Sequence, residues 1–165
     1  MRLLLTLLTA LALTLPAAAM AGEGEPAPDF TLKSIGGENV ALGDHLGKEV
    51  IILSFWATWC GPCLKEMPKL MELQEELKDK GLRVFWISVD DAKDEAKVGG
   101  IARRFKLPDD QVLLDFERKV VSQYHKRGVP PFTVVIGKDK TKILEKLGYT
   151  EGDEEKIHET VAGAL

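Results

Sequence analysis

Cysteine is scarce in this chain of 165 residues, which contains only Cys60 and Cys63, two residues apart. Small exported domains that rely on disulfides for stability carry several cysteines, and a structural zinc site takes four ligands, usually cysteine pairs or cysteines with histidines. The three histidines, His45, His125 and His158, are scattered without ligand spacing. The composition therefore predicts neither a disulfide-stapled scaffold nor a zinc site, and we expect no metal and no cofactor.

Basic runs are also missing. Lys and Arg total 22 against 26 Asp and Glu, which gives a formal net charge of −4 and a pI of about 5.5. Because nucleic acids and anionic membranes attract basic patches, we expect no nucleic-acid partner. The hydrophobic share of 45% and the charged share of 29% are those of a globular protein. The length predicts one domain, and we expect it to act as a monomer.

The N-terminus has the pattern of an export signal. A positive start at Met1-Arg2 is followed by an apolar run from Leu3 to Leu15 and by the small-residue site Ala19-Met20-Ala21. We predict a signal peptide over 1–21, a flexible leader over 22–27 and the domain over 28–165. The protein would then be exported to the periplasm or another extracytoplasmic space. An uncleaved membrane tether stays open, although the run is shorter than the about 20 residues of a spanning helix.

Hydrophobic periodicity divides the domain into alternating strands and helices. It predicts strands over 28–33, 39–42, 50–56, 83–89, 111–114, 132–136 and 143–147, and helices over 61–80, 94–105, 119–126 and 154–165. The first two strands form a hairpin around Gly36-Gly37, and the last two form a second hairpin. The order predicts an α/β domain with a central mixed β-sheet flanked by helices.

The cysteine pair lies where a predicted strand ends and a helix begins. Closing so short a loop stabilises a fold by roughly 2 kcal/mol at most, so the pair indicates chemistry rather than scaffolding. Free N–H groups and the helix dipole would stabilise a Cys60 thiolate and lower its pKa. Cys63, one turn further on, can reach the same sulfur. The spacing thus predicts that Cys60 attacks a disulfide and that Cys63 resolves the mixed disulfide.

The segment from Phe55 to Pro68, FWATWCGPCLKEMP, resembles the active-site segment of the TlpA/ResA-type thioredoxin-like proteins. These are exported or membrane-tethered thiol–disulfide oxidoreductases. The resemblance continues through the segments 28–32, 112–115, 128–130 and 148–150, and covers nearly all of the domain. It implies a thioredoxin-like fold with an extra N-terminal β-hairpin, and a redox-active disulfide between Cys60 and Cys63.

The resemblance also assigns a substrate-binding surface. Trp59, Gly61 and Pro62 surround the cysteines, and Val129-Pro130 stands where thioredoxin-like proteins carry a cis-proline loop that offers backbone to an extended substrate. The residue after Pro130 departs from the family pattern, because Pro131 replaces the usual Thr. Which of the two prolines follows a cis bond stays open.

Glu66 is the third implied catalytic residue. ResA-like proteins carry a glutamate three residues after the second cysteine, which is implied to handle the proton of that cysteine. Spacing of three residues puts Glu66 and Cys63 on one helix face, and burial would raise the pKa of the carboxyl. The alternative is a solvated glutamate on an acidic helix. Ser54 stands where cytoplasmic thioredoxins have a buried Asp, so Glu66 is the better candidate for an acid near Cys63.

Two other function classes compete with this interpretation. A peroxiredoxin-like peroxidase would need the pattern Pro-x-x-x-Thr-x-x-Cys, but Leu53 and Ala57 stand where its Pro and Thr would be. A non-catalytic binding module that kept the fold would not need Cys60, Cys63, Pro130 and Glu66 together. A module that handles metal or haem, or that senses redox state, stays open as a minor alternative.

The Gly-Pro pair between the cysteines is thioredoxin-like, and thioredoxin is a reductant. By this analogy we expect a reductant of protein disulfides, kept reduced by a membrane electron donor. The family role to test first is cytochrome c maturation.

Overall fold

The structure is a computed structural model that describes residues 24–165; the predicted signal segment lies outside them. The strands are β1 (Thr31–Ser34), β2 (Asn39–Ala41), β3 (Val50–Trp56), β4 (Leu82–Ser88), β5 (Val112–Leu114), β6 (Phe132–Ile136) and β7 (Lys142–Leu147). The α-helices are α1 (Gly61–Leu77), α2 (Glu95–Phe105), α3 (Lys119–Tyr124) and α4 (Asp153–Ala164). The elements expected from periodicity are all present, and their bounds differ from the expected ones by at most three residues.

The strands form one seven-stranded sheet in the order β2-β1-β5-β4-β3-β6-β7. The central strands β3, β4 and β5 run parallel, whereas β1, β2, β6 and β7 join by antiparallel pairing. The expected mixed sheet and N-terminal hairpin are confirmed. All seven residues of β3 are buried, which explains why its sequence is nearly apolar throughout instead of alternating between apolar and polar residues.

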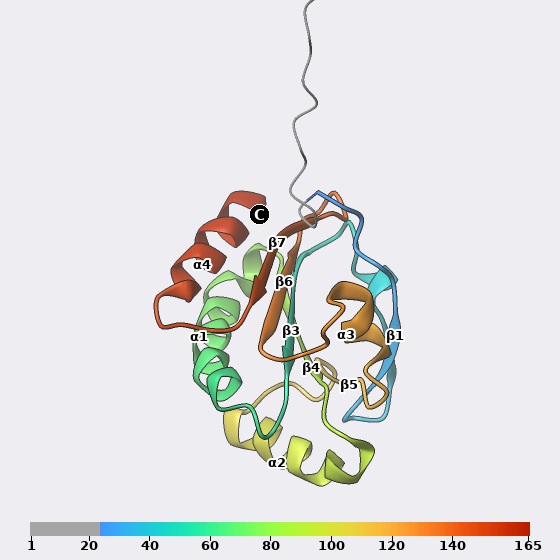
Figure 1. The fold of residues 1–165 in the computed structure, drawn as a ribbon. Coiled ribbons are helices and arrows are strands. Elements are labelled where there is room, and N and C mark those ends of the chain that lie inside the picture. Colours follow the sequence, from blue (N-terminus) through green and yellow to red (C-terminus); the bar gives the residue numbers. More distant parts are fainter. Residues whose placement is uncertain (1–23) are drawn as a thin grey trace, which may run out of the picture.

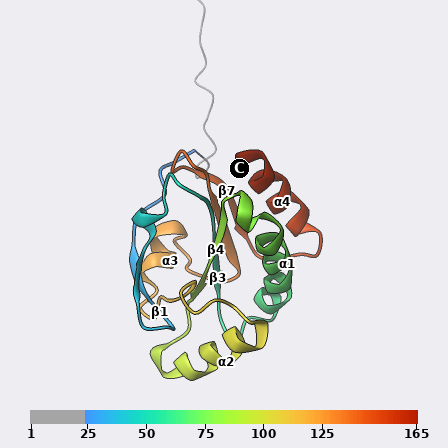
Figure 2. The same cartoon turned by 180° about the vertical axis from the view of Figure 1, so that it is seen from behind.

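Helices cover both faces of the sheet. Figures 1 and 2 show α1 and α4 side by side on one face and α3 on the other, with α2 near the end of the sheet where α1 begins. The core lies between these layers and includes Leu53 and Phe55 of β3, and Met67 and Leu70 of α1. Within residues 24–165 no helix is long and apolar enough to cross a membrane.

The two ends of the sheet differ in what they carry. β3 ends at Trp56, four residues before Cys60, and antiparallel pairing brings the start of β6 and the end of β7 to the same end. The opposite end holds the turn between β6 and β7. There, residues 24–27 of the predicted leader donate and accept backbone hydrogen bonds with Lys140 and Lys142. The described chain therefore starts at the end of the sheet away from the cysteines.

Candidate functional site

Cys60 and Cys63 form a disulfide at the start of α1. Cys60 is the N-cap residue, and its Sγ accepts a hydrogen bond of 3.3 Å from the backbone N–H of Cys63. Pro62 occupies the first turn of the helix, where a missing N–H costs nothing. Both cysteines are nearly buried, with 5% and 2% of their surface exposed. The arrangement directs one helix N–H group, that of Cys63, at the Cys60 sulfur.

The surface beside the disulfide is apolar and open. Trp59 is 59% exposed, which is unusual for so large a side chain, and Gly61 and Pro62 are exposed beside it. Val129, 44% exposed, lies in the loop that leads into β6. The first residue of β6 pairs with Phe55 at the cysteine end of β3, so this loop reaches the same end of the sheet.

The structure decides which proline is cis. The cis bond joins Pro130 to Pro131, so Pro131 and not Pro130 is the cis-proline of this loop. Pro131 is buried, and its carbonyl accepts a hydrogen bond of 2.8 Å from the N–H of Gly148. The residue before the cis bond is thus itself a proline, which has a carbonyl to offer but no N–H.

Glu66 is buried, with 2% of its surface exposed, one helical turn after Cys63. Its Oε1 accepts a hydrogen bond of 3.0 Å from the hydroxyl of Thr133, the second residue of β6. The alternative interpretation, a solvated glutamate, is therefore wrong. In the sheet register, Thr133 lies between Ser54 and Lys146, so these three side chains share the sheet face that α1 covers.

Burial raises the pKa of Glu66 to about 7. The hydrogen bond from Thr133 and the positive charge of Lys146 oppose this rise, whereas the negative charges of Asp153 and Glu154 add to it. Lys146 itself is held by an ion pair with Asp153 and by a hydrogen bond of 2.7 Å to the carbonyl of Gly148. A carboxyl that titrates near neutrality can both take up and release a proton at that pH, and this one lies one helical turn from Cys63.

Thr133 and Lys146 were not identified from the sequence. Thr133 is 67 residues from Glu66, and no local pattern connects the two. The only available signal was a polar residue, Thr133, inside the otherwise apolar strand predicted over 132–136.

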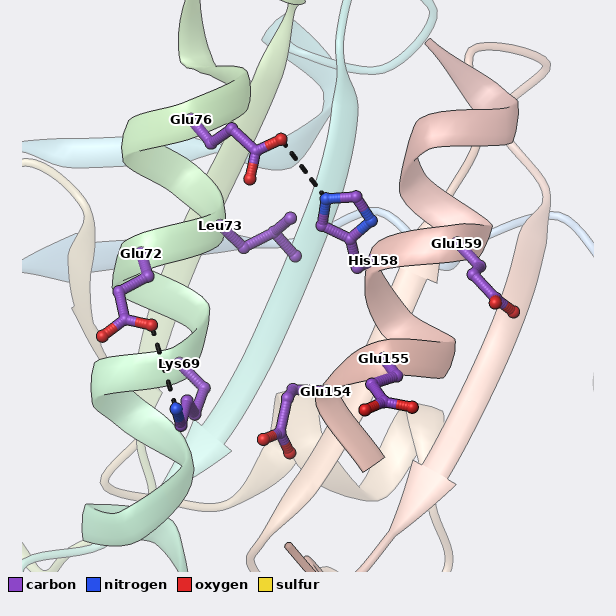
Figure 3. A pocket seen from close by; sticks show the side chains of 8 residues that line it. All are labelled: Lys69, Glu72, Leu73, Glu76, Glu154, Glu155, His158 and Glu159. Carbon is purple, nitrogen blue, oxygen red and sulfur yellow. Dashed lines mark hydrogen bonds and ion pairs between the residues drawn. The ribbon is translucent and has the colours of Figure 1, made fainter. Parts of the chain in front are cut away.

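A separate hollow of about 420 Å³ lies between α1 and α4. Figure 3 shows His158 of α4 reaching across to Glu76 of α1, at 3.4 Å. The other residues that line this hollow are Lys69, Glu72, Leu73, Glu154, Glu155 and Glu159. With a rise of about 1.5 Å per residue, the α1 residues of this hollow lie about 9 to 20 Å beyond Cys63 along the helix. It is therefore not part of the disulfide site. In residues 24–165 no group of three or more His, Cys, Asp or Glu side chains is placed to hold a metal ion.

Comparison with known proteins agrees with this geometry. The family model described as the AhpC/TSA family matches residues 24–143. The thioredoxin-like protein YneN of Bacillus subtilis is 39% identical over 130 residues, which are 78% of this chain and 69% of that protein. The thiol-disulfide oxidoreductase ResA of Bacillus subtilis is 33% identical over 133 residues, which are 78% of this chain and 72% of ResA.

The chain belongs to the AhpC/TSA family, among its ResA-like thiol–disulfide oxidoreductases. A crystal structure of a putative thiol:disulfide interchange protein DsbE from Chlorobium tepidum superposes with a TM-score of 0.71. That protein is 30% identical, and the match covers 86% of this chain and 96% of that one. The expected thioredoxin-like fold and the expected oxidoreductase class are confirmed.

Although the chain belongs to the AhpC/TSA family, its residues do not fit the peroxidase pattern Pro-x-x-x-Thr-x-x-Cys. Leu53 and Ala57 are fully buried apolar residues of β3 and the loop after it, so neither position supplies a hydroxyl near Cys60. Cys60 instead pairs with Cys63. The site of this oxidoreductase is built on a dithiol.

Proposed function

We propose that this protein reduces disulfide bonds in polypeptides, with Cys60 as the attacking and Cys63 as the resolving cysteine. The observation that carries the proposal is the position of the disulfide at the start of α1, where the Cys63 N–H donates to the Cys60 Sγ. In the reduced protein the same N–H and the helix dipole would favour a Cys60 thiolate. Cys63 is less exposed and lies one turn inside the helix, as suits a sulfur that acts second.

The reaction is a two-step exchange of two electrons. The Cys60 thiolate attacks one sulfur of the substrate disulfide, which forms a mixed disulfide and releases the other substrate sulfur as a thiolate. The Cys63 thiolate then attacks the Cys60 Sγ. This step re-forms the Cys60–Cys63 bond and releases the substrate with two reduced cysteines.

Glu66 would accept the proton that Cys63 must lose before the second step. Its raised pKa, about 7, leaves the carboxyl able both to take and to release a proton at neutral pH. Thr133 holds the carboxyl by its hydroxyl, and Glu66 follows Cys63 by one turn of the same helix. Glu66 is the only buried acid of α1, so it is the acid of this helix that we assign to the thiol.

The substrate would bind across the open surface beside the disulfide. Trp59, Gly61 and Pro62 are exposed on one side of it, and Val129 and Pro130 lie on the loop before β6. Pro130 has no N–H, so an extended substrate would be recognised here through carbonyl acceptors and apolar contact rather than by two-way backbone pairing.

The Gly-Pro dipeptide supports reduction as the direction, by analogy with thioredoxin. A membrane electron donor would return the dithiol to its reduced state, and the export pattern of the N-terminal segment supports an extracytoplasmic location. Cytochrome c maturation, in which haem-binding cysteine pairs must be reduced, is the process we would examine first.

A trap for the mixed disulfide tests the assignment of the two cysteines. We expect Cys63→Ser to accumulate a covalent complex with substrate polypeptides in the extracytoplasmic fraction, because Cys60 can attack but the complex cannot be resolved. Cys60→Ser is the matched control and should accumulate none. Equal trapping by both variants, or trapping by Cys60→Ser alone, would contradict the assignment.

Equilibration with glutathione tests the direction. A reductant should have a potential near that of thioredoxin, about −270 mV, and a value above about −180 mV, the range of an isomerase, would contradict it.

A further inference from the structure

A second buried carboxylate lies near the disulfide and is not used by the proposed reaction. Asp90 follows the end of β4 by two residues and is fully buried. Within residues 24–165, no Lys, Arg or His side chain forms an ion pair with it. Burying a carboxylate costs free energy unless hydrogen bonds compensate for the lost water. The groups that donate hydrogen bonds to Asp90 therefore indicate which part of the chain it keeps in place.

Three donors serve the carboxylate of Asp90. The hydroxyl of Thr58 donates to Oδ1 at 2.7 Å, and the N–H of Thr58 donates to Oδ2 at 2.9 Å, with a longer contact of 3.2 Å to Oδ1. The hydroxyl of Ser88 donates to Oδ2 at 2.9 Å and accepts from the N–H of Asp90 at 3.2 Å. Two of the three donors therefore belong to one residue, Thr58, which is 32 positions away in the sequence.

Thr58 is the middle of the short connection that carries the reactive sulfur. Only residues 57–59 separate the end of β3 from Cys60. The carbonyl of Trp56 accepts from Val89 at 2.9 Å, and the N–H of Cys60 donates to the carbonyl of Ala57 at 3.0 Å. The connection is thus held at both ends by backbone bonds, and Asp90 holds its centre.

We infer that Asp90 is a positioning residue for Cys60 and acts through Thr58. The carboxylate keeps the connection between β3 and α1 in the one conformation that sets the Cys60 Sγ against the N–H of Cys63. It also fixes the backbone from which Trp59 projects into solvent. A charge-assisted pair of bonds to one residue suits this task, since such bonds are shorter and stronger than bonds between neutral groups.

The inference deepens the proposed function, because it concerns the residue proposed to attack, but its test does not need a protein substrate. In a Cys63→Ser background Cys60 is the only thiol, and its alkylation rate against pH reports the thiolate midpoint. We expect Thr58→Val to raise this midpoint, because the Asp90 charge stays while the sulfur loses its alignment with the helix N–H groups. The rate of attack on a small aromatic disulfide should fall by about three- to tenfold, as for other misplaced reacting groups.

Matched variants separate positioning from general damage. Thr58→Ser keeps the hydroxyl and should restore the parental midpoint and rate. Asp115→Asn alters another buried carboxylate, which instead accepts from the N–H groups of Val120 and Val121 at the start of α3. It should lower the melting temperature and leave the Cys60 midpoint unchanged.

A parental midpoint and rate in Thr58→Val would overturn the inference, as would an equal shift in Asp115→Asn. If the midpoint shifts as expected but no protein disulfide is reduced, the proposed function fails and the positioning role stands. Asp90→Ala removes the whole set of bonds, so it should slow the attack on the aromatic disulfide more than Thr58→Val does. The comparison uses this rate and not the midpoint, because the variant also removes a negative charge that itself raises a nearby thiol pKa. A double variant with Thr58→Val should then be no slower than Asp90→Ala alone, because both changes break the same link.

Discussion

Glu66 and Asp90 are two buried carboxyl groups near one disulfide, and they differ in the number of hydrogen bonds they receive. Among the described residues, 24–165, Asp90 accepts from two donors of Thr58 and one of Ser88, whereas the side chain of Glu66 accepts from Thr133 alone. Asp90 lies behind the connection that leads to Cys60, and Glu66 lies on the helix that carries Cys63.

The number of donors distinguishes a buried acid that anchors the backbone from one that can exchange a proton. Three donors hold the oxygens of Asp90 in one place, which makes it an anchor for backbone. One donor leaves Glu66 mainly subject to the cost of burial, and its pKa rises to about 7. The same residue chemistry thus serves to position one sulfur and, as we propose, to exchange a proton with the other.

The largest effect is expected from Glu66→Gln on the pH dependence of stability. Because the folded-state pKa of about 7 lies above 4.5, the ordinary value for a glutamate, the stabilising contribution is complete below pH 4.5 and is lost as the pH rises through 7. The loss should be about 3 kcal/mol in the oxidised parent and absent in the variant. Urea unfolding at pH 4.5, 6 and 8 measures it, and parallel curves for the two proteins would contradict the raised pKa.

A smaller effect is expected on the Asp90 side from Ser88→Ala. The variant leaves Oδ2 of Asp90 without one donor and the N–H of Asp90 without its acceptor. We expect the free energy of unfolding at pH 7 to fall by about 1–2 kcal/mol. Ser122→Ala is the control, because the hydroxyl of Ser122 donates at the exposed surface to the carbonyl of Arg118, and its loss should change stability by less than about 0.5 kcal/mol. An equal loss of unfolding free energy in both variants would contradict a stabilising role for the buried hydrogen bonds between Ser88 and Asp90.

The smallest effect is expected from Lys146→Met on the titration of Glu66. The positive charge of Lys146 lowers the pKa of Glu66, so the variant should raise that pKa above about 7. Carbon NMR of the Glu66 carboxyl against pH measures the shift. Lys78→Met, at the far end of α1, should leave the titration unchanged. An unchanged or lowered pKa of Glu66 in Lys146→Met would contradict the effect of the Lys146 charge.

Features that depend on neighbouring residues could be predicted from the sequence. The strand over 50–56, the helix that begins at Gly61 and the N-terminal hairpin are set by hydrophobic periodicity and by Gly and Pro. The same patterns place Cys60 at a strand-to-helix junction, so its exposure to helix N–H groups followed from local order alone.

Features that depend on distant residues could not be predicted. The position of the cis bond before Pro131 rather than Pro130 is one case, since two adjacent prolines look alike in sequence. The hydrogen bonds of residues 24–27 with Lys140 and Lys142 are another, because a polar Gly- and Pro-containing segment carries no signal of its partner.

The sequence by itself determined the dithiol, its place at the start of a helix and the alternation of strands and helices that supports it. Only the tertiary structure decided that Glu66 meets Thr133 and that Asp90 meets Thr58, across 67 and 32 residues. The physical reason is that periodicity and turn chemistry act over a few residues, whereas the donors of a buried carboxyl are chosen by strand register and helix packing. The cysteines could be named from the sequence, but the groups that hold and serve them could not.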